Sequence, residues 1–172
     1  MTTDELLNIA ITAARLSPNR VRRVGAVLVP QHGAAAGAIH ACNTYPNGVH
    51  DTEQRHLGNG RLIWMEHAER NAIYAAAKAG IATEGASLAS TYFPCTDCAR
   101  AIVQSGIRHL HTLPPDYSDP VWGESFVPSR TMLEEAGVAL HFSDRDAAQL
   151  HADSMAPVRG SGRGPSAPKN VT

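Results

Sequence analysis

Two short motifs constrain the fold of this chain more than any other feature of the sequence. They are His67-Ala68-Glu69 and Pro94-Cys95-Thr96-Asp97-Cys98, and each stands where a predicted helix begins. The first motif alone carries little information, because about 0.4 copies of His-x-Glu are expected in a shuffled chain of this composition. The second is rarer, since about 3% of shuffled chains hold a Cys-x-x-Cys spacing. If the motifs act together, the fold must bring two helix starts side by side.

The side chains of these motifs form a donor set that suits zinc. Cys95 and Cys98 are three residues apart at a helix start, so both sulfurs can face one ion, and His67 can supply a nitrogen. Three protein ligands leave a position open for water, which distinguishes a catalytic zinc from a structural one. Glu69 can then carry the proton of that water without binding the metal. The pattern therefore predicts a catalytic zinc site.

The order of predicted elements indicates an α/β fold. Thr2-x-x-Glu5 is a capping box that precedes a helical apolar pattern. The remaining sequence alternates strand and helix signals up to residue 142. The predicted elements are a helix at 4–16, strands at 24–29 and 34–41, a helix at 66–79, a strand at 87–93, a helix from Cys95 to before Gly106, a strand at 109–113, a helix at 130–136 and a strand at 138–142. This order predicts a three-layer α/β/α sandwich with a mixed sheet.

Two segments stand apart from this pattern. Residues 43–65 form a long polar segment, and a loop of that length inside one domain is usually functional or mobile. Residues 155–172 are rich in Gly, Pro and Ser, so we predict a flexible tail. The predicted domain therefore covers residues 1–154. The 27 alanines of the whole chain favour helices that lie close to the sheet.

Charge and composition exclude several classes of protein. The whole chain carries 15 basic and 16 acidic side chains, but three of the basic ones lie in the tail, which leaves the domain acidic. An acidic domain is poorly suited to binding a nucleic-acid duplex, because its charge repels the phosphate backbone. We find no membrane span and no secretion signal, so we expect a cytoplasmic protein whose three cysteines stay reduced.

The motifs and their surroundings resemble the zinc-dependent cytidine and deoxycytidylate deaminases, and most closely the deoxycytidylate (dCMP) deaminases. The likeness covers roughly residues 5–142. It is carried by Val24-Gly25-Ala26-Val27, His67-Ala68-Glu69-x-Asn71-Ala72-Ile73, Phe93-Pro94-Cys95-x-Asp97-Cys98-Ala99-x-Ala101-Ile102, Gln104-Ser105-Gly106-Ile107, Trp122 and Glu135-Ala136-Gly137-Val138.

The resemblance implies a five-stranded sheet in a three-layer domain, a homo-oligomer, and hydrolytic removal of the 4-amino group of a cytosine ring. It also implies that His67, Cys95 and Cys98 hold Zn²⁺ and that Glu69 moves the proton. The backbone of Ala68 would bind the base, and Asn43 would contact the sugar of the substrate. The regulated members have Gly-Tyr-Asn-Gly where this chain has Ala41-Cys42-Asn43-Thr44. The resemblance therefore does not extend to control by deoxynucleoside triphosphates, nor does it fix whether the substrate carries a phosphate.

Further side chains are candidates for substrate contacts. A dianionic phosphate needs cationic partners, which four arginines could provide: Arg22, Arg23, Arg55 and Arg61. Three aromatic rings could stack on a base, and each could equally belong to ordinary packing: Tyr92, Phe93 and Trp122.

Alternative interpretations remain open at this point. Cys42 could complete a structural zinc knuckle, or join His50 or His56 in a second metal site. The substrate could be a free base or nucleoside (cytosine, cytidine or guanine) or adenosine in a tRNA, although the acidic domain argues against tRNA. The chain could also be an inactive zinc module that binds a nucleotide or a partner protein.

Overall fold

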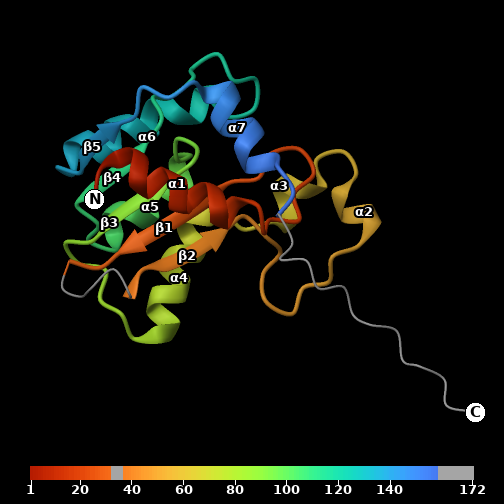
Figure 1. Cartoon of the computed structure of the whole chain (residues 1–172), viewed down its shortest axis with the longest axis horizontal. Coiled ribbons are helices and arrows are strands. Elements are labelled where there is room, and N and C mark those ends of the chain that lie inside the picture. The colour runs from red at the N-terminus through yellow and green to blue at the C-terminus, as the bar shows by residue number, and fades with distance from the viewer. Residues whose placement is uncertain (32–36, 159–172) are drawn as a thin grey trace, which may run out of the picture.

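A five-stranded mixed sheet forms the centre of the protein (Figure 1). The computed structural model describes residues 1–31 and 37–158. The strands are β1 (Gly25–Val29), β2 (Ile39–Cys42), β3 (Ser87–Ser90), β4 (His109–Thr112) and β5 (Ala139–Phe142). They follow the order β2-β1-β3-β4-β5, with β1 antiparallel to both neighbours and β3, β4 and β5 parallel. The predicted α/β class with a mixed five-stranded sheet is confirmed.

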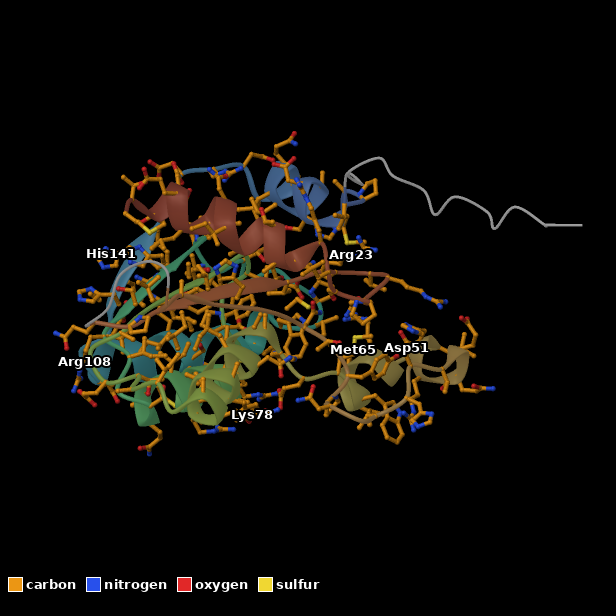
Figure 2. The ribbon with its side chains drawn as sticks, turned by 60° about the horizontal axis from the view of Figure 1, so that its bottom comes forward. Arg23, Asp51, Met65, Lys78, Arg108 and His141 are labelled. Atoms are coloured by element: carbon orange, nitrogen blue, oxygen red, sulfur yellow. The ribbon has the colours of Figure 1, made fainter. Side chains whose placement is uncertain are left out.

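Helices cover both faces of this sheet. α1 (Thr3–Ala14) and α7 (Ala147–Met155) lie on one side, and α4 (Ala68–Ala79), α5 (Thr96–Gln104) and α6 (Gly123–Glu135) lie on the other. The short helices α2 (Glu53–His56) and α3 (Gly60–Trp64) lie beside the sheet (Figure 1). Figure 2 shows α1 and α7 above the sheet and α4 below it. The Thr2–Glu5 capping box forms as predicted, because the Thr2 side chain accepts from the Glu5 amide and the Glu5 carboxylate accepts from the Thr2 amide.

Alternation along the strands divides the core between the two faces. Val27 of β1 and Ala89 of β3 pack with Leu6 of α1. Their neighbours Leu28 and Leu88 point to the opposite face, where they pack with residues of α4, α5 and α6. The residues of α4 in this layer are small, which lets the helix axis approach the sheet closely: Ala68, Ala72 and Ala76.

Three parts of the chain differ from the sequence prediction. The helix predicted at 130–136 begins earlier, at Gly123, and contains Pro128. Burial of Phe126 and Leu133 along its inner face outweighs the hydrogen bond that Pro128 removes. The polar segment 43–65 contains the short helices α2 and α3, and α7 forms where no helix was predicted.

The predicted tail starts at Met155, which the structure places at the end of α7. Residues 159–172 lie outside the described residues, as does 32–36 of the predicted hairpin. The flexible tail therefore stays a prediction. Among the described residues, no helix is long and apolar enough to cross a bilayer.

The contact between α1 and β1 generates a prediction about stability. A Cβ atom on Gly25 would overlap the carbonyl oxygen of Ala10 and lie 2.6 Å from the amide nitrogen of Ala14. These atoms belong to the backbone of α1, so only a shift of the whole helix could relieve the overlap. We expect Gly25→Ala to lower the free energy of unfolding by at least about 2 kcal/mol, as measured by urea denaturation.

The matched control is Gly37→Ala, because no heavy atom would lie within 4 Å of a Cβ at Gly37. A Gly25→Ala protein as stable as the Gly37→Ala protein would contradict the close packing of α1 on β1.

Candidate metal centre and pocket

Two helix starts meet at one end of the sheet and bring the predicted metal ligands together. His67 is the N-cap residue of α4, and Cys95 is the N-cap residue of α5. The segment before α4 is held by a β-bridge between Thr44 and Glu66. The segment before α5 comes directly from β3, and Pro94 fixes its backbone where the helix begins. Each motif is thus anchored to the sheet or to its neighbouring loop.

The three ligand atoms lie within 4.8 Å of one another. Nδ1 of His67 is 3.5 Å from Sγ of Cys95 and 3.5 Å from Sγ of Cys98. One imidazole nitrogen and two sulfurs form a donor set that zinc binds in tetrahedral geometry. The residues therefore fit a zinc ion, with His67, Cys95 and Cys98 positioned to hold it.

Neither alternative role for Cys42 is supported. Within residues 1–31 and 37–158, the cluster of His67 with the two helix-start cysteines is the one group of three or more possible ligands. Cys42 lies in β2 opposite Gly25, outside that cluster. His56 instead bonds the carboxylate of Asp51. The set of three protein ligands is that of a catalytic rather than a structural zinc.

The two sulfurs differ in their affinity for a proton. The hydrogen bond with Cys98 lowers the pKa of Cys95 to about 4, with burial acting against it and His67 reinforcing it. The same bond, together with burial, raises the pKa of Cys98 above its usual range. A thiolate is the form that binds a metal, so Cys95 is prepared for this role.

Glu69 lies beside the ligand cluster and is almost completely buried, with 3% of its surface exposed. Its Oε1 accepts a hydrogen bond of 3.2 Å from Oγ of Ser90, and its Oε2 lies 3.6 Å from Sγ of Cys98. Burial raises the pKa of this carboxyl group, and the hydrogen bond from Ser90 acts in the opposite direction. A carboxyl group with a raised pKa is suited to taking up and releasing a proton.

One pocket is lined by His67 and Cys95 of the ligand cluster, by Glu69 and by most of the predicted substrate contacts. Its lining includes Arg22, Asn43, Ala68, Phe93 and Trp122. The ring of Trp122 stands edge-on to the ring of His67, with 5.1 Å between the centroids. Phe93 is 2% exposed and packs edge-on against Phe126, so most of its ring belongs to the core.

Asn43 is engaged mainly with the protein itself. Its Oδ1 accepts hydrogen bonds from Ser17 Oγ at 2.7 Å and from the Val24 amide at 2.8 Å. Its Nδ2 donates to the carbonyl oxygen of Arg22 at 3.0 Å. An amide nitrogen has two hydrogens, so a single N–H group remains for a contact with a ligand.

The four candidate arginines occupy different surroundings. Arg22 and Arg61 line the pocket of the ligand cluster. Arg23 lines an adjoining cavity of about 230 Å³ beneath α7, where its Nη1 lies 3.4 Å from the Met155 carbonyl oxygen. Arg55 lies over the ring of Trp64, 4.1 Å from its centroid, and is not part of the pocket lining. Arg22 and Arg61 are therefore the two candidate arginines that line this pocket.

Asp119 is an important residue that the sequence analysis missed. Its Oδ2 accepts a hydrogen bond of 2.5 Å from the Tyr92 hydroxyl and lies 3.4 Å from the Arg22 guanidinium. Its Oδ1 accepts from the amides of Val121 and Trp122. One carboxylate thus joins three pocket-lining residues from three segments. The one sequence signal was an aspartate three residues before Trp122, a common spacing for a helix-start cap.

Ser90 was missed for a different reason. The sequence predicts only that it belongs to a strand, and its contact with Glu69 comes from packing between β3 and α4. Asn19, Leu62 and Met65 also line the pocket; Leu62 belongs to the short helix α3 and the other two to loops, and the positions of all three depend on the tertiary structure.

Comparison with known proteins agrees with this geometry. The family model of the cytidine and deoxycytidylate deaminase zinc-binding region matches residues 1–113. The ComE operon protein 2 of Bacillus subtilis is 30% identical over 147 residues, which cover 85% of this chain and 70% of that protein. The deoxycytidylate deaminase of Mus musculus is 29% identical over 137 residues, covering 76% and 72% of the two chains.

The fold also has a counterpart among solved structures. The dCMP deaminase of the cyanophage S-TIM5, solved in complex with dCMP and dUMP, superposes with a TM-score of 0.63 at 22% identity. The match covers 81% of this chain and 95% of that one. The family match spans the ligand residues His67, Cys95 and Cys98. The chain therefore belongs to the zinc-binding family of cytidine and deoxycytidylate deaminases.

Proposed function

We propose that this protein catalyses the hydrolytic deamination of dCMP to dUMP with release of ammonia. The observation that carries the proposal is the buried carboxylate of Glu69, which lies 3.6 Å from a metal-ligand sulfur in the pocket lined by His67 and Cys95. Support for the nucleotide comes from relatives named deoxycytidylate deaminase and from the cyanophage enzyme solved with dCMP and dUMP.

The reaction consumes one water and releases one ammonia. A zinc ion held by His67, Cys95 and Cys98 supplies Lewis-acid chemistry that makes water a nucleophile at neutral pH. Glu69 takes the proton from the attacking water, passes it to N3 of the ring as C4 is attacked, and delivers a proton to the departing amino group. Its raised pKa favours this double role, because the group must be both base and acid.

The pocket walls would orient the ring and the sugar phosphate. The Ala68 backbone starts α4 beside Glu69, so we place the base against this helix start. Trp122 bounds the pocket next to His67, where a ring can stack on the indole. Asn43 has one N–H group for the sugar, and Arg22 and Arg61 are the cations of the lining that could meet a phosphate.

The alternative functions require different features of the protein. A free base or nucleoside needs no cation in the pocket, and a tRNA substrate needs a basic path for its backbone. An inactive zinc module would not need the buried carboxylate of Glu69. Ammonia release from a panel of dCMP, CMP, dCTP, deoxycytidine, cytosine, guanine and adenosine separates these possibilities.

We also propose that the protein is a homo-oligomer in the cytoplasm. Beyond the alanines that pack on the sheet, α4 carries Ala77 and Ala79 on its exposed side, and small side chains there favour close approach of a second copy. Light scattering at micromolar concentration tests this state.

The ligand set predicts the metal content. We expect one zinc per chain, and we expect Cys95→Ser, Cys98→Ser and His67→Ala to lose it, because each removes one of three ligands. Loss of zinc should also lower the melting temperature, since the metal ties the starts of α4 and α5 together. Elemental analysis of purified protein measures the content.

Cys42→Ser is the matched control, because Cys42 lies outside the cluster and should leave zinc content unchanged. Full zinc in Cys95→Ser, or loss of zinc in Cys42→Ser, would refute the assigned ligands.

The proton-carrier role predicts the effect of Glu69→Gln. The amide cannot transfer the proton, so we expect kcat to fall by about 10²- to 10⁴-fold while zinc content stays full. Glu135→Gln, at the exposed end of α6, should keep the wild-type rate. A Glu69→Gln enzyme with more than about a tenth of the wild-type kcat would contradict the mechanism.

The phosphate assignment predicts a preference for dCMP over deoxycytidine. Arg22→Ala and Arg61→Ala should each raise KM for dCMP by about 10- to 100-fold, since each removes a charge-assisted hydrogen bond. The double variant should lose the preference. Arg55→Ala is the control, because its side chain stacks on Trp64 outside the pocket lining.

Steady-state kinetics with both substrates makes the test. If the wild-type enzyme deaminates deoxycytidine as efficiently as dCMP, the phosphate assignment fails while the chemistry at Glu69 stands.

A further inference from the structure

Ser90 places a hydroxyl group on the apolar face of the sheet. Alternation along β3 directs Leu88 and Ser90 toward α4 and α5, while Ala89 faces α1. Ser90 is fully buried, with 0% of its surface exposed. A buried hydroxyl is costly unless it forms hydrogen bonds, and an apolar residue would suit the packing of this face equally well. The presence of this hydroxyl therefore requires a buried hydrogen-bond partner.

The contacts of Ser90 provide that partner. Its Oγ donates to Oε1 of Glu69 at 3.2 Å. The same oxygen lies 3.5 Å from the amide nitrogen of Tyr92, which donates to it. Because the backbone amide occupies an acceptor position, the hydrogen of the hydroxyl is left to point at the carboxylate.

This bond makes the two carboxylate oxygens of Glu69 unequal. Oε1 is tied to β3 through Ser90, whereas Oε2 lies 3.6 Å from Sγ of Cys98, on the side of the ligand cluster. A hydrogen bond to one oxygen restricts rotation of the carboxylate about its terminal bond, so the other oxygen keeps a more constant position. A proton carrier needs a fixed oxygen, because that oxygen must take a proton from water and release protons within hydrogen-bond reach of N3 and of the amino nitrogen.

We infer that Ser90 is a positioning residue for Glu69, which holds the carboxylate so that Oε2 carries the proton. The inference rests on the proposed deaminase function and deepens it. Ser90 does not line the pocket, and Glu69 is the one side chain among the described residues that it bonds. Its removal should therefore affect the chemical step and leave substrate binding unchanged.

The test is Ser90→Ala, assayed as the zinc-loaded full-length enzyme. We expect kcat to fall about 10- to 100-fold, as for loss of a hydrogen bond to a charged group, with KM within about twofold of wild type. Ser90→Thr keeps the hydroxyl and should retain most of the rate. Ser154→Ala is the matched control, because Ser154 is equally buried but donates to the Leu150 carbonyl within α7.

A second measurement separates positioning from a general effect on the fold. In a Glu69→Ala background, followed under single-turnover conditions with excess enzyme, adding Ser90→Ala should change the residual rate less than about twofold. A merely structural role would lower zinc content or slow both backgrounds alike.

Three outcomes would overturn the inference: a zinc-loaded Ser90→Ala enzyme with kcat within twofold of wild type, an equal loss in the Glu69→Ala background, or Ser90→Thr as slow as Ser90→Ala. Failure of the proposed function looks different, because Glu69→Gln would then keep its rate or the wild-type enzyme would release no ammonia.

Discussion

The convergence of two helix starts is the constraint on which the rest of the structure depends. The first amides of α4 and α5 have no partner within their helices, so both starts carry partial positive charge. This charge favours a thiolate at Cys95 and a carboxylate at Glu69, two groups whose burial would otherwise be costly. The metal site can exist inside the protein because its anionic groups lie where two helices begin.

Small residues make this convergence possible. Three alanines are fully buried where α4 lies on the sheet: Ala68, Ala72 and Ala76. On the other face, the backbone of α1 leaves no room for a side chain at position 25, which is a glycine. Larger side chains would move the helix axes away from the strands, and the starts of α4 and α5 would move with them. The many alanines of the sequence thus determine the geometry of the site as well as the composition of the core.

The metal half of the site could be predicted from the sequence because its information is local. The spacing of Cys95 and Cys98 and their position at a helix start suffice to bring two sulfurs to one point. The substrate half depends on contacts between distant segments. Arg55 stacks on Trp64, and Asn43 uses most of its polar atoms to hold the Ser17–Val24 loop. For α7, the Asp146-x-x-Gln149 cap was present as a local signal, yet no long apolar pattern followed it.

The substrate half is also a single coupled unit. Asp119 links Arg22, Tyr92 and the backbone of Trp122, so these walls of the pocket keep their positions together. Burial alone would raise the pKa of Asp119, but the hydrogen bonds from Tyr92 and the two backbone amides lower it further than burial raises it. The carboxylate therefore stays charged and holds its partners at neutral pH. The metal ligands and Glu69 are not members of this network, which adjoins them through the Trp122 ring beside His67 and through the Tyr92 amide on Ser90. A change at Asp119 should therefore alter the walls of the pocket more than the deamination chemistry.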